Sequence, residues 1–295
     1  MGYSSWSDAA YRSVARERAT TGGHEVFRGE KSVDPLMDPR GLGVRESRDS
    51  EHHPDSVPII VAFDVTGSMG HVPQRFAGEL LGRLMRLLVE EGWVVDPQVL
   101  FAAIGDAVSD RAPLQVGQFE SGLEMDMWLT RLWLERGGGD IPESYTLAHW
   151  FARHHTATDA WEKRRRRGYL FTIGDADNKP LHVSHLRRVF GGLIEHSGTD
   201  LDVVRAAAER YHVFHIHLDR RGVHPEATRR FLDAWQGLVG DGLLVTEQPD
   251  AICELIGVAI GLTEGRLDRE ASHRVLIAAG MGEDRVASAL ERLAP

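Results

Sequence analysis

The sequence predicts a doubly wound α/β fold, with a mostly parallel central sheet of about six strands and helices on both faces. Six short apolar runs alternate with helical patterns along most of the chain, which is the order expected of a parallel sheet. The first run, residues 59–63, is apolar at every position, as in a strand that is buried on both faces. A polar loop and then a helical pattern at residues 73–91 follow it. Such a loop lies at the edge of the sheet where α/β folds bind ligands.

The remaining elements follow from the same patterns. Strands are predicted at residues 99–104, 114–119, 169–173, 213–218 and 243–246, and helices at 125–134, 142–151, 201–211, 225–238 and 249–262. Residues 114–119 alternate only weakly, so this strand is expected at an edge, where an antiparallel direction is compatible with a mostly parallel sheet. Pro142 is expected in the first turn of the helix that it precedes.

The chain is predicted to consist of three parts. Residues 1–56 form an N-terminal extension, in which a short helix precedes a polar segment that lies extended over the domain or is partly disordered. Residues 57–265 form the α/β domain, and residues 266–295 form a helical tail interrupted by glycines. The tail either packs on the preceding helix or recruits a partner, and the pattern is compatible with both.

Composition and charge favour a cytoplasmic protein that binds neither nucleic acid nor membranes. The net charge of -10 disfavours attraction to nucleic-acid phosphates and to anionic lipid. We find no apolar run long enough to span a membrane and no signal-peptide pattern at the N-terminus. The single cysteine, Cys253, suits a reducing compartment. It lies in an apolar helical pattern and is interpreted as a core residue rather than a nucleophile.

Two groups of residues have a functional interpretation that is weaker than the structural one. The basic run at residues 163–167 is interpreted as a solvated helix end before the next strand rather than as a nucleic-acid patch. His215 and His217 are two residues apart in a predicted strand and would face the same side of it. We favour two buried, hydrogen-bonded histidines beneath a helix over a zinc pair.

Oxygen-bearing side chains follow the first predicted strand. Asp64, Thr66 and Ser68 occupy every second position, with glycines among them. A carboxylate and two hydroxyls could hold a hard divalent cation, because magnesium prefers oxygen ligands. Residues 64–69 (DVTGSM) resemble the D-x-S-x-S-M signature of von Willebrand factor A (vWA) domains, with Thr66 in place of the first serine and its hydroxyl preserved. In that family this motif opens the metal-ion-dependent adhesion site (MIDAS).

Two further stretches support the resemblance to vWA domains. Residues 136–144 (RGGGDIPES) resemble the G-G-G-[TD]-x-P-E loop of the family, and the glycines would allow the backbone to approach another loop closely. Asp140 stands where adhesion-type members carry a threonine, so it would bind the metal directly or through water. Residues 171–177 (FTIGDAD) resemble the element that carries the last metal-site carboxylate, which is Asp175 here.

The resemblance implies a cation site that is built from three loops. If their strands are neighbours, Asp64, Asp140 and Asp175 meet at one edge of the sheet, where buried anions repel unless a cation such as Mg²⁺ or Mn²⁺ is present. Asp106, which follows the second strand, is a candidate to support the site from behind. His182 either orients a site carboxylate or simply lies in a loop. The alternative is that these residues only cap helices. Capping could account for one such loop, but it does not explain three loops that match the family in the same order.

The resemblance covers about residues 57–265 and implies a protein-binding module rather than an enzyme. In the family, a glutamate or aspartate of a partner protein completes the coordination of the metal. Three carboxylates would make this site less attractive to an acidic partner than adhesion-type sites. The alternative function is an Mg²⁺- or Mn²⁺-dependent hydrolase or phosphotransferase, but the chain lacks the P-loop, H-E-x-x-H and kinase motifs. By analogy with intracellular bacterial members of the family, the resemblance further suggests an adaptor of an AAA-type ATPase or a component of a bacterial defence or stress system.

Overall fold

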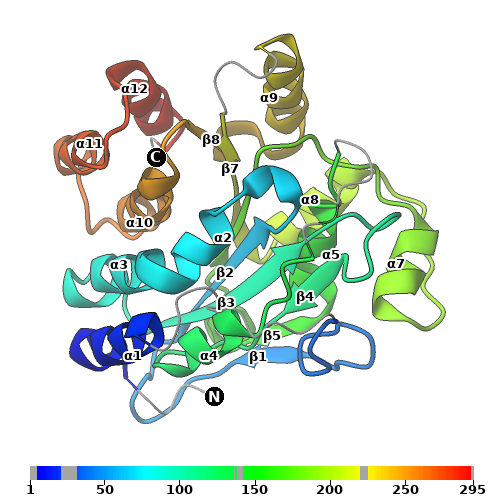
Figure 1. Cartoon of the computed structure of the whole chain (residues 1–295), viewed down its shortest axis with the longest axis horizontal. Helices are drawn as coiled ribbons and strands as arrows, with labels where there is room; N and C mark the ends of the chain where they lie inside the picture. The colour runs from blue at the N-terminus through cyan, green and yellow to red at the C-terminus, as the bar shows by residue number, and fades with distance from the viewer. Residues whose placement is uncertain (1–4, 21–31, 136, 138–141, 220–224, 294–295) are drawn as a thin grey trace.

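A six-stranded sheet forms the centre of the computed structural model, which describes residues 5–20, 32–135, 137, 142–219 and 225–293 (Figure 1). Its strands, in chain order, are β2 (Val57–Asp64), β3 (Pro97–Ile104), β4 (Leu114–Val116), β6 (Gly168–Gly174), β7 (Tyr211–Leu218) and β8 (Leu243–Thr246). They lie in the order β4-β3-β2-β6-β7-β8, and only β4 runs antiparallel to its neighbour. The predicted doubly wound fold with an antiparallel edge strand is therefore confirmed.

Helices cover both faces of this sheet (Figure 1). One face carries α1 (Asp8–Thr20), α2 (Val72–Arg75), α3 (Leu81–Met85), α4 (Glu124–Thr130), α10 (Ile252–Thr263), α11 (Arg269–Ala278) and α12 (Glu283–Arg292), and the other carries α5 (Thr146–His154), α7 (Val183–Phe190), α8 (Asp200–Ala208) and α9 (Pro225–Val239). None of the helices among the described residues is both long and apolar enough to cross a membrane.

The central strand contributes to two hydrophobic cores. In β2, Ile59, Val61 and Phe63 pack into the core beneath α3 and α10, whereas Ile60 and Ala62 pack into the core beneath α5 and α8. Successive side chains of a strand point to opposite faces, so a strand that is covered on both faces must be apolar throughout. This explains the uninterrupted apolar run in the sequence.

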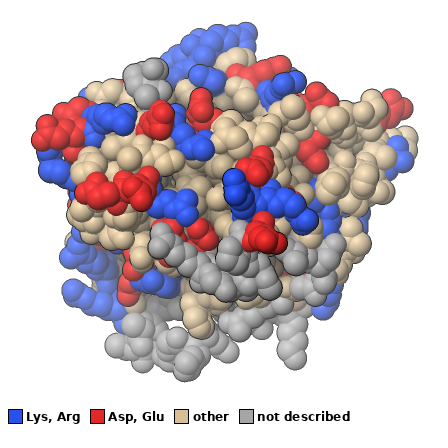
Figure 2. Space-filling view, turned by 90° about the horizontal axis from the view of Figure 1, so that it is seen from above, with Lys and Arg blue, Asp and Glu red and all other residues tan. Residues whose placement is uncertain are grey.

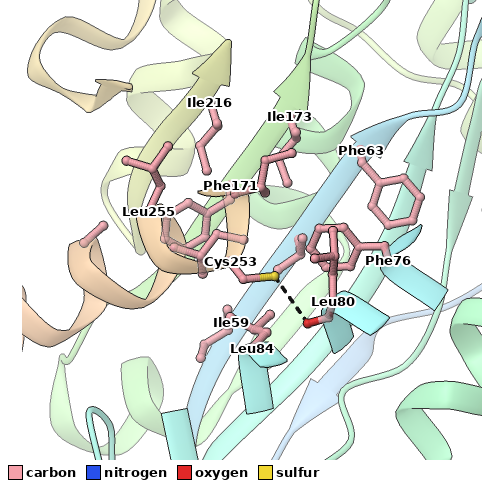
Figure 3. Close-up of a cluster of buried hydrophobic side chains, with 14 of the residues drawn as sticks. Ile59, Phe63, Phe76, Leu80, Leu84, Phe171, Ile173, Ile216, Cys253 and Leu255 are labelled. Atoms are coloured by element: carbon pink, nitrogen blue, oxygen red, sulfur yellow. Dashed lines mark hydrogen bonds between the residues drawn. The ribbon is translucent and has the colours of Figure 1, made fainter. Parts of the chain in front are cut away.

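Cys253 belongs to the first of these cores, as predicted. Its side chain is fully buried in α10, and its thiol donates a hydrogen bond to the carbonyl oxygen of Leu80 over 3.3 Å (Figure 3). Ile59 and Phe171 of the sheet lie beside it in the same cluster. Burial raises the pKa of the thiol well above its ordinary value, which is the behaviour of an inert core residue.

The described residues of the N-terminal extension pack on the domain, both in α1 and from residue 34 onward. Met37 is fully buried, and its carbonyl oxygen accepts a hydrogen bond from the amide of Val116 over 2.9 Å, which covers the free edge of β4. Strand β1 (Arg45–Ser47) then pairs in parallel with β5 (Thr156–Thr158) in a second, two-stranded sheet. The described part of the polar segment therefore lies extended over the domain, which was one of the two predicted alternatives.

The basic run at residues 163–167 meets acidic side chains of this extension and of the C-cap of α10. Asp49 bonds Arg164 over 2.8 Å and Lys163 over 3.1 Å, and Arg166 pairs with Glu264 over 2.5 Å. Helix α6 (Asp159–Arg164) ends in this run. The prediction of a helix end before the next strand is confirmed, and ion pairs within the chain neutralise much of its charge.

The C-terminal tail is a helical hairpin of α11 and α12. Leu276 and Val286 are buried against the core that α10 helps to form. Arg285 of α12 bonds Asp219, at the end of β7, over 2.6 Å and Glu247, after β8, over 2.8 Å. The tail therefore packs on the preceding helix, and recruitment of a partner stays a prediction.

Three features differ from the prediction or were missed. Pro142 is not helical, because α5 begins only at Thr146 with Tyr145 as its N-cap. Helix α7 and the pair β1–β5 were not predicted, since their segments are short and mostly polar. Pro142 instead lies in the connection that leads from the second motif to α5, and this connection positions part of the candidate site.

Candidate metal site

The candidate site lies where the strand order of the sheet reverses. Strands β2 and β6 are neighbours, the following strands in the sequence lie outward on opposite sides, and Phe63 is aligned with Ile173. Asp64 and Asp175 therefore leave the sheet at the same edge, one from each of these central strands. This reversal point at the carboxyl ends of the strands is the usual ligand position in doubly wound folds.

Four of the five predicted ligands are described, and hydrogen bonds join them. Asp64 is fully buried, and its Oδ1 accepts hydrogen bonds from the Thr66 amide over 2.7 Å and the Thr66 hydroxyl over 2.6 Å. The Ser68 hydroxyl donates to Asp175 Oδ1 over 2.8 Å. The first and third predicted loops are thus brought together. Asp140 lies outside the described residues, and its role stays a prediction.

The two hydroxyl oxygens are arranged as cation ligands would be. Thr66 Oγ1 and Ser68 Oγ lie 3.2 Å apart. Each hydroxyl has one proton, and when both protons are directed to the carboxylates, none remains for the contact between the oxygens. Two lone-pair-bearing oxygens then face each other, which a cation between them would stabilise. Neighbouring ligands of an octahedral Mg²⁺ are about 3 Å apart, so the spacing fits.

The donor set consists of hydroxyls as much as carboxylates. Within the part of the chain that the structure describes, no three His, Cys, Asp or Glu side chains form a group that could hold a metal ion. The candidate site instead combines two carboxylates with the hydroxyls of Thr66 and Ser68. Oxygen donors of this kind suit Mg²⁺ or Mn²⁺ rather than zinc.

Burial makes the negative charge of the site costly. It raises the pKa of Asp64 to about 7, against the hydrogen bonds from Thr66, and the nearby charge of Asp175 acts in the same direction as burial. A carboxylate that must ionise in such an environment is stabilised by a cation or else takes up a proton. The electrostatics therefore favour cation binding.

Hydrogen bonds of the backbone connect the second loop to its neighbours. The amide of Gly67 donates to the Gly137 carbonyl over 3.3 Å, and the amide of Glu143 donates to the Asp177 carbonyl over 3.0 Å. A Cβ atom at Gly137 would come within 2.0 Å of Asp110 Oδ1. The prediction that these glycines allow close approach to another loop is confirmed at Gly137.

Two residues that the sequence analysis did not select lie at the site. The Tyr145 hydroxyl donates to Asp64 Oδ2 over 2.8 Å. Glu143 is only 3% exposed, and its Oε2 has no hydrogen-bond partner among the described residues. Burial, together with the charge of Asp64 and of the carboxylates after β3, raises the pKa of Glu143 to about 9. Glu143 could have been selected as the last residue of the G-G-G-[TD]-x-P-E pattern, whereas nothing in the sequence marks Tyr145.

The two predicted supporting residues have partners of their own. Asp106 is buried, and its carboxylate bonds Lys179 over 2.8 Å and the Ser109 hydroxyl over 2.6 Å. His182 is exposed at the N-cap of α7, with its ring edge-on to that of His185 at 5.2 Å. The roles proposed for Asp106 and His182 at the metal site stay predictions.

His215 and His217 are both buried in β7, as predicted. The His215 ring stacks on Trp235 at 3.5 Å, and its Nδ1 lies 2.9 Å from the Thr172 hydroxyl. The prediction that both rings are fully hydrogen-bonded is wrong in one respect, because His215 Nε2 and His217 Nδ1 have no partner in the described part of the chain. Burial lowers the pKa of His217 to about 4 and that of His215 well below its ordinary value, so both rings are neutral core residues.

Comparison with solved structures finds distant neighbours of this fold. No protein-family model and no curated protein matches the chain. Proximal thread matrix protein 1 from the mussel byssus is 11% identical with a TM-score of 0.46, over 74% of this chain and 48% of that one. The pilus adhesin SpaC from Lactobacillus rhamnosus GG is 8% identical with a TM-score of 0.46, and the match covers 80% of this chain and 31% of the adhesin. An aerotolerance-related membrane protein from Bacteroides fragilis is 12% identical with a TM-score of 0.39, and the match covers 78% of this chain and 98% of that protein.

The chain spans about half of the mussel protein and about a third of the pilus adhesin. At this level of similarity, an inference about function depends on the geometry of the loops themselves.

Proposed function

We propose that the chain is a vWA-type protein-binding module that depends on a divalent cation, Mg²⁺ or Mn²⁺, at the β2–β6 edge of the sheet. The observation that carries this proposal is the pair of hydroxyl oxygens, Thr66 Oγ1 and Ser68 Oγ. They lie 3.2 Å apart and each directs its proton to a carboxylate. Helix capping does not account for this arrangement, because neither hydroxyl accepts a capping hydrogen bond from the helix that follows.

The residues of the site would have distinct roles. Thr66 and Ser68 would bind the cation through their hydroxyl oxygens, while Asp64 and Asp175 orient these hydroxyls and supply the balancing charge. Asp140 would add a third carboxylate, directly or through water. When bound, the cation supplies a Lewis-acid position that an acidic side chain of a partner can complete.

The balance of charge sets the strength of partner binding. Asp64 and Asp175 together already match the two positive charges of the cation, so ionised Asp140 would leave the site negative. We therefore expect weaker capture of acidic partners than at sites with two aspartates and a threonine. We expect binding rather than turnover, in the cytoplasm, with an AAA-type ATPase as the partner class that the resemblance suggests.

Nucleic acid is not the partner that we expect. Acidic and basic side chains are interspersed over the face seen in Figure 2, without a large area of positive charge. Arg164 and Arg166, in the strongest basic run, are paired with acidic side chains of the chain itself. A surface of this kind lacks the continuous positive track that binds phosphates.

Calorimetry with Mn²⁺ and Mg²⁺ tests the proposal directly. We expect the wild type to bind one divalent cation, and Asp64→Asn to bind none measurably. A wild type that binds no cation at millimolar concentration would overturn the proposal.

Affinity capture with the wild type and Asp64→Asn, each with Mg²⁺ and with EDTA, then identifies a partner retained only by the cation-loaded wild type. A phosphatase and nuclease screen tests the hydrolase alternative, for which turnover lost in Asp64→Asn would be required.

A further inference from the structure

We infer that Tyr145 is a positioning residue of the cation site, which fixes the Asp64 carboxylate so that Thr66 presents its oxygen to the cation. This inference rests on the proposed function of the site. Tyr145 is the N-cap of α5 and lies 81 residues after Asp64 in the sequence. Its phenol is fully buried and donates a hydrogen bond to Asp64 Oδ2 over 2.8 Å.

The hydrogen bond from Tyr145 completes the set of donors around Asp64. Oδ1 accepts from the amide and the hydroxyl of Thr66, and Oδ2 accepts from Tyr145. Because both oxygens are held, the carboxylate cannot rotate about its terminal bond, and the Thr66 proton stays directed toward Oδ1. Asp64 would then act on the cation through the Thr66 hydroxyl that it orients. Without the phenol, Oδ2 would be a buried carboxylate oxygen without a donor.

Aromatic packing fixes the ring of Tyr145. It lies edge-on to His215 at 5.3 Å and to Trp235 at 5.2 Å. The Trp235 indole donates to the carbonyl oxygen of Ala176 over 3.0 Å, and Ala176 directly follows Asp175. The same aromatic cluster thus holds the first loop through Tyr145 and the third loop through Trp235. The relative placement of Asp64 and Asp175 depends on this cluster.

The space for the phenol depends on the absence of a side chain at Gly174. A Cβ atom at this position would come within 1.9 Å of the Tyr145 hydroxyl oxygen and 2.5 Å of its ring carbon. Gly174 ends β6 immediately before Asp175, so the missing side chain at the end of this central strand makes room for the tyrosine at the start of α5. This close fit explains why a large aromatic residue can reach Asp64 at the edge of the sheet.

The test compares Tyr145→Phe with Tyr211→Phe. Tyr211 is also buried, and its hydroxyl lies 2.7 Å from the Thr156 hydroxyl at the opposite end of the sheet, so Tyr211→Phe loses a comparable hydrogen bond away from the site. Mn²⁺ affinity is measured by calorimetry and by electron paramagnetic resonance, and folding by urea unfolding in EDTA. We expect Tyr145→Phe to weaken Mn²⁺ binding about 10- to 100-fold and Tyr211→Phe to leave it unchanged.

Each outcome separates this inference from the proposed function. If the wild type binds Mn²⁺, Asp64→Asn does not, and Tyr145→Phe binds as tightly as the wild type, the positioning role is wrong while the cation site stands. If the wild type itself binds no Mn²⁺, the site is wrong. A second measurement uses the wild type alone and so does not depend on whether a variant folds. In an NMR spectrum of the chain labelled at the tyrosine ring carbon that bears the hydroxyl, one of the five tyrosine resonances should shift on addition of Mg²⁺. The absence of any shift in a protein that binds Mg²⁺ would also contradict the inference.

Discussion

Ser68 Oγ lies 2.8 Å from Asp175 Oδ1, although 107 residues separate the two in the sequence. This hydrogen bond joins the loop after β2 to the loop after β6. It exists because these strands are neighbours at the point where the strand order of the sheet reverses. The bond also leaves the Ser68 oxygen without a proton toward Thr66, which is the basis for placing a cation there.

Substituting Ser68 with alanine should remove a ligand and the link between the two loops. We expect Ser68→Ala to weaken Mn²⁺ binding about 100-fold or more, and to change the free energy of unfolding in EDTA by no more than about 0.5 kcal/mol because Ser68 is exposed. Thr199→Ala is the control for affinity. The exposed Thr199 hydroxyl donates to Asp202 over 2.8 Å at the start of α8, and neither residue belongs to the candidate site. Equal losses of affinity in the two variants would move the site away from Ser68.

The pH dependence of stability should report the cost of burying Asp64. Burial raises the pKa of Asp64 from 3.8 to about 7 in the folded protein without a cation. Between these values the folded state binds the proton more tightly than the unfolded state, so this group lowers stability as the pH rises from about 4 to about 7. Asp64→Asn cannot ionise. We expect it to be more stable than the wild type at pH 8 in EDTA, by about 1–3 kcal/mol.

Urea unfolding at pH 5 and pH 8, each with EDTA and with Mg²⁺, checks this expectation. Mg²⁺ should stabilise the wild type at pH 8 and leave Asp64→Asn unchanged, since only the wild type binds the cation. A variant that is less stable than the wild type at pH 8 in EDTA would mean that the buried charge is already well compensated by the hydrogen bonds from Thr66 and Tyr145.

Much of the fold could be predicted because the central strands are buried on both faces. All eight residues of β3 are buried, so its apolar run is visible in the sequence without knowledge of its neighbours. The strands β1 and β5 are only three residues long and are mostly polar. Their pairing brings Arg45 beside Thr156, and this long-range contact leaves no periodic pattern in either segment.

The residues of the candidate site likewise fall into those that the sequence could reveal and those that it could not. Asp64, Thr66, Ser68 and Asp175 could be selected because they follow apolar runs in a recognisable order. Tyr145 could not, because its contact with Asp64 depends on where α5 begins and on the missing side chain at Gly174. Such a contact is a property of three elements together and not of any local stretch.

The ion pairs of Asp49 should contribute measurably to stability. Asp49 accepts hydrogen bonds from Arg164 over 2.8 and 3.1 Å and from the Ser56 hydroxyl over 2.8 Å, with its side chain only 16% exposed. Asp49→Ala would leave the guanidinium of Arg164 half-buried without this partner. We expect a loss of about 1–3 kcal/mol in the free energy of unfolding, measured in urea at pH 7.5.

An exposed ion pair serves as the control for Asp49. Glu270 and Arg274 are paired on the surface of α11 with side chains 85% and 64% exposed, so Glu270→Ala should cost no more than about 0.5 kcal/mol. If Asp49→Ala were as mild as Glu270→Ala, the extension would be attached mainly by β1 and Met37.

Acid should unfold the protein through its buried histidines. Burial lowers the pKa of His149 and of His217 to about 4, and lowers that of His215 well below its ordinary 6.5. The unfolded chain takes up protons at these positions near pH 6.5 and the folded chain does not. The stability they provide is therefore complete above pH 6.5 and is lost as the pH falls from 6.5 toward 4. Each such histidine contributes up to about 1.4 kcal/mol per pH unit, and the raised pKa values of Asp64 and Glu143 act in the opposite direction.

Urea unfolding between pH 7.5 and pH 4.5 measures this slope, and His149→Leu tests its origin. The leucine fills a similar volume in a site where His149 Nε2 has no hydrogen-bond partner among the described residues, and it cannot take up a proton. We expect the slope to fall by up to about 1.4 kcal/mol per pH unit, because one titrating group is removed. A slope that His149→Leu does not alter would assign the acid lability to the other buried or half-buried histidines, His212, His215 and His217.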